Sequence, residues 1–152
     1  MNLVEKCRKA LELLELDNIP IIFDEFCYYN VTSNVIAMNA LDACSQKDEW
    51  YTMANTLLSN AEDYSLILWS LLHEYGHYQD AMETYSDEED AFFRELMLMM
   101  PEGSEKVMAY FNLPSERVAS AWAAEFIRDN AEKCIEVDRL LFWDYSCYLT
   151  NR

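Results

Sequence analysis

The chain has 152 residues, a length typical of one compact domain, so we predict a single domain over residues 1–152. Hydrophobic residues make up 52% of it and only 2 glycines and 3 prolines occur, which excludes a disordered or collagen-like protein. The 28 acidic and 11 basic residues give a formal net charge of −17, so we expect neither direct nucleic-acid binding nor membrane binding, and basic partners are favoured.

The cysteines and the apolar segments indicate the compartment. The 5 cysteines are an odd number without a CxxC pair, which favours buried thiols in a reducing compartment over a disulfide framework. They are Cys7, Cys27, Cys44, Cys134 and Cys147. Residues 1–9 mix charged and apolar side chains and lack a signal-peptide core, and no apolar run reaches the roughly 18 residues of a membrane helix. We therefore expect a cytoplasmic protein.

The first forty residues predict one helix and a small sheet. Apolar residues at helical spacing begin at Val4, and the helix is expected to end before Pro20. The β-branched and aromatic run 21–29 predicts a strand, and the turn-like stretch 30–34 separates it from a second short strand, 35–38. Two short strands without a glycine-rich crossover predict a small antiparallel sheet.

The remainder predicts helices. Ser45 is expected to cap the first of them, Ser86 and Glu89 form a capping-box pattern, and Met97–Met100 is expected to pack in the core. The predicted helices cover about 45–58, 62–83, 86–101, 104–111, 114–130 and 133–149. The expected fold class is therefore α+β with mostly α-helices.

The motif His73-Glu74-Tyr75-Gly76-His77 carries the chemistry, and it contains both histidines of the chain. Residues i and i+4 of a helix lie on one face, so both imidazoles can reach the same ion, while Glu74 lies about 100° round the helix. Two histidine ligands with a glutamate as general base are the arrangement of zinc metallopeptidases. We predict that His73 and His77 bind Zn²⁺ and that Glu74 activates a water; a helix with two histidines by chance is the alternative.

Gly76 indicates how this helix packs. A glycine within a helix costs about 1 kcal/mol relative to alanine. Because the chain has only 2 glycines, this one predicts that another element packs closely against the helix. A kink or an early end of the helix is the alternative.

Catalytic zinc sites usually have a third protein ligand. Asp80 lies one turn beyond His77, but three ligands in a row along one straight helix cannot easily close a tetrahedron. Glu116 begins a later helix whose small residues allow a close approach. Glu125 lies half a turn out of phase with Glu116, so both cannot face one site. We predict Glu116 as the third ligand, with a solvated first-turn carboxylate as the alternative.

These motifs resemble a known group of enzymes. The sequence SLLHEYGH, residues 70–77, followed by ExxAxxWA from Glu116, resembles zincins whose third ligand is a glutamate on a later helix, and most of all the ImmA/IrrE family of small intracellular metallopeptidases. The segment 34–39 is similar to the strand that this family places at the edge of its active-site cleft. The resemblance covers roughly residues 20–127, and anthrax-lethal-factor-type peptidases are a second relative.

The resemblance implies a zincin-like domain with a small N-terminal sheet, an HExxH active-site helix and a C-terminal helical part. Two departures affect the site. Thermolysin-like enzymes have an acid four residues after the glutamate ligand that orients a histidine; here Ser120 stands there, so we expect orientation from Asp80 or a backbone carbonyl. No third histidine can stabilise an oxyanion, and Tyr110 is the candidate, with a helix-packing aromatic as the alternative.

We predict a zinc-dependent endopeptidase that cleaves an intracellular protein or peptide. Residues 80–105 contain nine acids and one base, which suits a basic substrate such as a DNA-binding regulator; an ordinary solvated acidic face is the competing explanation. An extended substrate could pair with the strand 35–38. The main alternative is an acidic inhibitor or adaptor that mimics nucleic-acid charge and has a vestigial or structural metal site. Hydrolysis of a bond other than a peptide is a further alternative.

Overall fold

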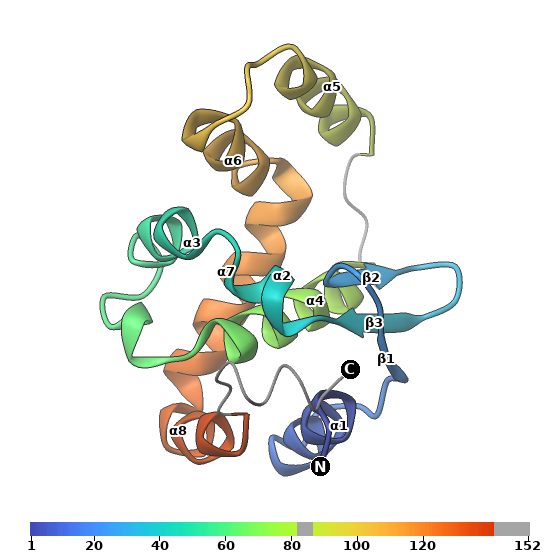
Figure 1. The fold of residues 1–152 in the computed structure, drawn as a ribbon, viewed down its shortest axis with the longest axis vertical. Coiled ribbons are helices and arrows are strands. Elements are labelled where there is room, and N and C mark those ends of the chain that lie inside the picture. The colour runs from blue at the N-terminus through green and yellow to red at the C-terminus, as the bar shows by residue number, and fades with distance from the viewer. Residues whose placement is uncertain (82–86, 142–152) are drawn as a thin grey trace.

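The computed structural model describes residues 1–81 and 87–141 (Figure 1). Within these residues the protein is mostly helical with one small sheet, which confirms the α+β class dominated by helices. In chain order the elements are α1 (Leu3–Leu13), β1 (Ile21–Phe23), β2 (Tyr28–Asn30), β3 (Val35–Met38), α2 (Ala40–Cys44), α3 (Lys47–Ala54), the 3₁₀ turn η1 (Ala61–Asp63), α4 (Leu66–Ala81), α5 (Asp87–Leu98), α6 (Ser104–Phe111), α7 (Pro114–Asp129) and α8 (Ala131–Leu140).

The sheet is mixed, so the prediction of a purely antiparallel sheet is wrong. The predicted strand 21–29 is broken into β1 and β2 at residues 24–27, where the Asp24 carboxylate accepts the Glu25 N–H at 2.7 Å. The strand order is β1-β3-β2, with β1 parallel and β2 antiparallel to β3. The bend reverses the chain between β1 and β2, which allows both to pair with the same third strand.

β3 is the central strand, with β1 on one side and β2 on the other, so the prediction that an extended substrate pairs with the strand 35–38 is wrong. Ile36, Ala37 and Met38 are completely buried, and because consecutive side chains of a strand point to opposite faces, both faces of β3 are covered. Three consecutive apolar residues are typical of such a strand, whereas a half-exposed edge strand alternates. Both edge strands are partly exposed, and β2 contacts α4.

The segment after β3 also differs from the prediction. A short helix, α2, begins at Ala40, and the Asn39 side chain caps it by accepting the Asp42 N–H at 3.0 Å. Ser45 ends this helix instead of starting the next: its hydroxyl donates to the Asp42 carbonyl. The predicted capping box at Ser86 lies outside the described residues, as does the last predicted helix beyond residue 141.

The core forms around α4, which α7 crosses near the middle of the molecule (Figure 1). Leu68, Trp69, Leu71 and Leu72 of α4 are completely buried. In Figure 1, α1 and α8 lie at one end of the molecule, and α5 and α6 form the other end. Among the described residues, no helix combines the length and apolarity that crossing a bilayer requires.

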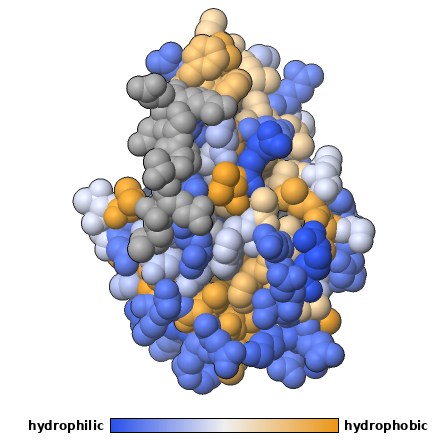
Figure 2. All heavy atoms as spheres, turned by 180° about the vertical axis from the view of Figure 1, so that it is seen from behind, coloured by the Kyte–Doolittle hydropathy of each residue, from blue (hydrophilic) through white to orange (hydrophobic). Residues whose placement is uncertain are grey.

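α5 has an exposed apolar face, so the prediction that Met97–Met100 packs in the core is wrong. Leu98 is 66% and Met99 84% exposed, and Phe92, Phe93 and Leu96 of the same helix are also exposed. Figure 2 shows hydrophobic surface at this end of the molecule. The helix lies at the end of the fold, where α6 and the start of α7 cover only part of it.

Candidate metal centre

α4 holds the two histidines of the motif one turn apart. The apolar turn before them is completely buried and fixes this part of the helix in the core. His73 is buried and His77 partly buried, and their ring centroids are 4.7 Å apart. The prediction that both rings share one helix face is confirmed.

Gly76 brings α7 close to this face. A Cβ atom at residue 76 would lie 2.6 Å from the Ala119 carbonyl oxygen and 3.0 Å from its Cα. Such distances are clashes with backbone, so only glycine permits this approach. The prediction of a close neighbour is confirmed, and the alternative of an early helix end is excluded because α4 continues to Ala81.

Glu116 meets both histidines from the first turn of α7. One oxygen, Oε2, lies 2.7 Å from His73 Nε2 and 2.9 Å from His77 Nε2. The carboxylate is buried, so the alternative of a solvated first-turn acid is wrong. α5 fixes the start of the helix, since the buried carboxylate of Asp90 accepts the N–H and hydroxyl of Ser115 at 3.1 and 2.7 Å.

The charges of these groups depend on one another. Burial favours the neutral acid, but the hydrogen bonds and positive charges of His73 and His77 hold the pKa of Glu116 well below its usual range. Burial favours a neutral imidazole, but the hydrogen bond and charge of Glu116 raise the pKa of His77. The centre is therefore an anionic carboxylate facing two basic nitrogens.

The donor set fits a metal ion. Within the described part of the chain, His73, His77 and Glu116 form a group whose ligand atoms all lie within 4.8 Å of one another. Two imidazole nitrogens and a carboxylate oxygen are a common protein ligand set of catalytic zinc. The three side chains can therefore hold a metal ion between α4 and α7.

Glu74 lies beside this group but outside it. Its carboxyl group is buried, and burial raises its pKa, with His73 and His77 partly opposing the rise and Glu116 adding to it. A carboxyl group of raised pKa takes and releases a proton more readily near neutral pH than an ordinary glutamate. The position next to the ligands suits a general base.

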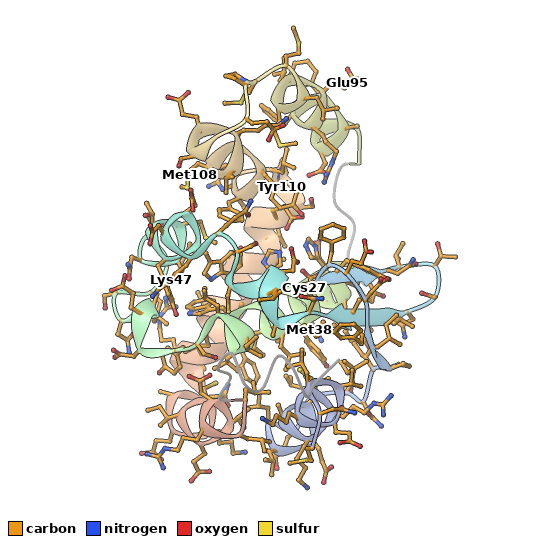
Figure 3. All side chains as sticks on the ribbon, in the orientation of Figure 1. Cys27, Met38, Lys47, Glu95, Met108 and Tyr110 are labelled. Atoms are coloured by element: carbon orange, nitrogen blue, oxygen red, sulfur yellow. The ribbon has the colours of Figure 1, made fainter. Side chains whose placement is uncertain are left out.

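Tyr110 reaches the centre from α6, and Figure 3 shows it near the start of α7. Desolvation at this position and the nearby negative charge of Glu116 raise the pKa of Tyr110 well above its usual range, while 37% of the residue is exposed. The hydroxyl thus remains protonated and available as a donor. Tyr110 also packs against α5, where the Arg94 guanidinium lies 5.9 Å from its ring centroid.

Two neighbours of His73 were not predicted to position its ring. Ser120 Oγ lies 3.0 Å from His73 Nδ1 and is completely enclosed, so orientation by Asp80 or a backbone carbonyl is not what the structure shows for this ring. The ring of Trp50, from α3, meets the His73 ring edge-on at 5.3 Å. Ser120 stands where thermolysin-like enzymes have the orienting acid, so the sequence marked the position but not the role; no local signal marks Trp50.

The two other acids considered as ligands lie apart from the group. Asp80 is buried on α4, and its charge contributes to the raised pKa of His77, but it is not among the three convergent side chains. Glu125 is exposed on α7, as its helical phase predicted.

A cavity of about 390 Å³ opens beside His73 and Glu74. Residues 26 and 27, α2, α3 and α6 form its other walls, and Cys27 and Tyr110 are labelled in Figure 3. The candidate centre is therefore reached from a space that can hold a ligand.

Comparison with known proteins gives no relative from which a role could be transferred. No protein-family model, no curated protein and no solved structure matches the chain. The assignment of a function therefore depends on the geometry of the centre.

Proposed function

We propose that the protein is a zinc-dependent endopeptidase with a zincin-like fold, similar to the ImmA/IrrE family, and that its substrate is a basic protein segment. The observation that supports this proposal is the convergence of His73, His77 and Glu116, with the buried Glu74 carboxyl group beside them. The cavity next to Glu74 gives a peptide access to these groups.

His73, His77 and Glu116 would hold the ion. When bound, zinc lowers the pKa of water and polarises the carbonyl group of a substrate. Glu74 takes a proton from the attacking water, whose oxygen forms a bond to the peptide carbonyl carbon. The same carboxyl group then gives this proton to the leaving nitrogen as the C–N bond breaks, so the products are a carboxylate and an amine.

The Tyr110 hydroxyl would stabilise the negative charge that develops on the carbonyl oxygen. It is a protonated donor at neutral pH and lines the cavity beside Glu74. A donor fixed by a helix stabilises this charge without having to reorganise during the reaction.

The general-base role of Glu74 is tested by Glu74→Gln. We expect the variant to keep about one zinc per chain but to lose turnover by roughly 10²- to 10⁴-fold, because the amide cannot accept the proton. Metal content is measured by mass spectrometry, and turnover on a random peptide library with product detection. Glu116→Ala should lose the zinc, and the exposed control Glu125→Gln should keep both zinc and activity. Full activity of Glu74→Gln would refute the mechanism.

The exposed apolar face of α5 favours one second candidate. Phe92, Leu96 and Met99 are exposed in a strongly acidic chain, as in a protein that binds a basic and apolar partner. An adaptor of this kind would bind its partner equally well after Glu74→Gln and after zinc removal. Absence of zinc from the wild-type protein, even after zinc is added, would favour it.

A further inference from the structure

The cavity beside Glu74 has one acidic side chain that the proposed mechanism does not use, Asp42 of α2. Asp42 is half-buried, and its Oδ2 accepts the Cys27 N–H at 2.7 Å. Its own N–H donates to the Asn39 side chain, so both ends of the residue are fixed. The carboxylate is thus held at the cavity wall, within electrostatic reach of Glu74.

The described walls of the cavity supply no cation that balances this charge. Among the described residues that line it, none is a lysine or an arginine. Arg94, which lies over the Tyr110 ring, is already paired with Asp90 at 3.2 Å. A partly desolvated carboxylate without a counter-ion is costly, and a cation that enters the cavity would reduce this cost.

The rest of the wall suits a long basic side chain. Phe26, Trp50, Tyr110 and Phe111 give it aromatic surface, on which the methylene groups of lysine or arginine can pack and with which their charges interact favourably.

We propose that this cavity binds a lysine or arginine side chain of the substrate next to the cleaved bond, and that Asp42 determines this specificity. The inference rests on the proposed peptidase function and adds the residue that selects the basic side chain and its place beside the cleaved bond. A neutral side chain would leave the Asp42 carboxylate unpaired, and an acidic one would be repelled. The net charge of −17 would also raise the rate at which basic segments arrive.

The test uses the full chain loaded with zinc and a set of alanine- and serine-based octapeptides. One guest residue, lysine, arginine, norleucine or glutamate, is placed at each position in turn. For the wild-type protein we expect kcat/KM to be at least about tenfold higher with lysine or arginine than with norleucine at one position beside the cleaved bond, as a charge-assisted contact gives. Equal cleavage of both would overturn the inference.

Three variants show whether Asp42 is responsible. Asp42→Asn keeps an acceptor for the Cys27 N–H but removes the charge. In this variant, kcat/KM should be about the same with lysine or arginine as with norleucine. Asp42→Glu restores the charge and should recover most of the preference. Asp48→Asn removes an equal charge from the exposed start of α3 and should leave the preference unchanged. A preference that survives in Asp42→Asn, with unfolding temperatures matched, would overturn the assignment.

Binding to zinc-loaded Glu74→Gln separates this inference from the proposed function. Calorimetry should show about tenfold tighter binding of the lysine peptide than of the norleucine peptide, and Asp42→Asn in the same background should abolish the difference. If the wild-type protein cleaves no peptide, the peptidase proposal fails, and the binding difference still decides the role of Asp42. Equal binding of the two peptides would refute that role.

Discussion

A single carboxylate oxygen organises the candidate centre: Glu116 Oε2 lies within hydrogen-bond distance of both histidines. Ser120 supports the arrangement from the other side of His73, at Nδ1. A serine hydroxyl can donate or accept, so it can hold the ring whether Nε2 faces a proton or a metal ion. This neutral group replaces the acid that thermolysin-like enzymes have at the same spacing.

Ser120→Ala tests this support. Removal of the hydroxyl leaves the His73 ring free to reorient, and loss of such a partner weakens metal binding by about tenfold or more. Zinc affinity is measured by competition with a chromogenic chelator. The control Ser33→Ala, in the exposed turn between β2 and β3, should bind as the wild type does. Equal affinity of Ser120→Ala and wild type would show that Trp50 and the packing of α4 suffice to position the ring.

The packing of α7 against α4 is the structural basis of the centre at the level of elements. Gly76 permits it, Ala119, Ala123 and Ala124 line the buried side of α7, and Asp90 fixes the start of that helix from α5. Without this close approach, Glu116 would not reach the histidines. The cost of a glycine within α4 is thus compensated by the position of α7.

Gly76→Ala changes the free energy of unfolding in opposite directions for the two possible roles of the glycine. If only helix propensity mattered, alanine would stabilise the protein by about 1 kcal/mol. Because the new Cβ would meet the Ala119 backbone, we expect destabilisation of roughly 1–3 kcal/mol instead, together with weaker zinc binding. Urea unfolding, with and without zinc, measures both effects. A more stable variant with unchanged zinc affinity would show that the helices need no close contact.

At the scale of the whole molecule, a metal ion would join residues 73–77 to residue 116, and so tie α4 to α7. Binding to the native state alone stabilises a protein by about 4 kcal/mol at a ligand concentration of a thousand times Kd. For a chain of this size, that free energy corresponds to a rise of roughly 10 °C in Tm. The metal and the fold are therefore expected to depend on each other.

The pH dependence of the zinc-induced rise in Tm follows from the protonation of the two imidazoles. They bind zinc only when neutral, and the pKa of His77 is raised, so protons compete at a higher pH than for an ordinary histidine. The zinc-induced rise in Tm should be full at pH 8 and lost as the pH falls to about 5. Without metal, the dependence of stability on pH is reversed. The pairing of protonated His77 with Glu116 stabilises the native state at low pH, and this stabilisation is lost as the pH rises through the raised pKa of His77.

Calorimetric scans with zinc and with chelator, from pH 5 to pH 8, measure both effects. Glu116→Ala should show little zinc-induced rise at any pH, because one of the three convergent ligands is missing. A rise of the same size in that variant would place the ion elsewhere in the protein.

Local sequence patterns determined the ligand positions and most of the helices. The spacing of His73 and His77 follows from the helical repeat. Gly76 indicated that another element packs closely against the helix, because glycine is costly inside a helix. The start of α7 at Pro114 and the full extent of α6 are also local properties, set by residues within one turn. Helix geometry alone disfavoured Asp80 and showed that Glu116 and Glu125 cannot both face one site.

Tertiary structure alone decided which strands pair and what surrounds the centre. The bend after Phe23 places β1 and β2 on opposite sides of β3, a long-range outcome that the pattern of either strand does not contain. Trp50 and Asp42 reach the centre only because α2 and α3 pack beside α4. The spacing of His73 and His77 follows from the fixed geometry of one helix. The walls of the cavity depend on how separate elements pack against one another, and this packing is determined by the burial of the whole core.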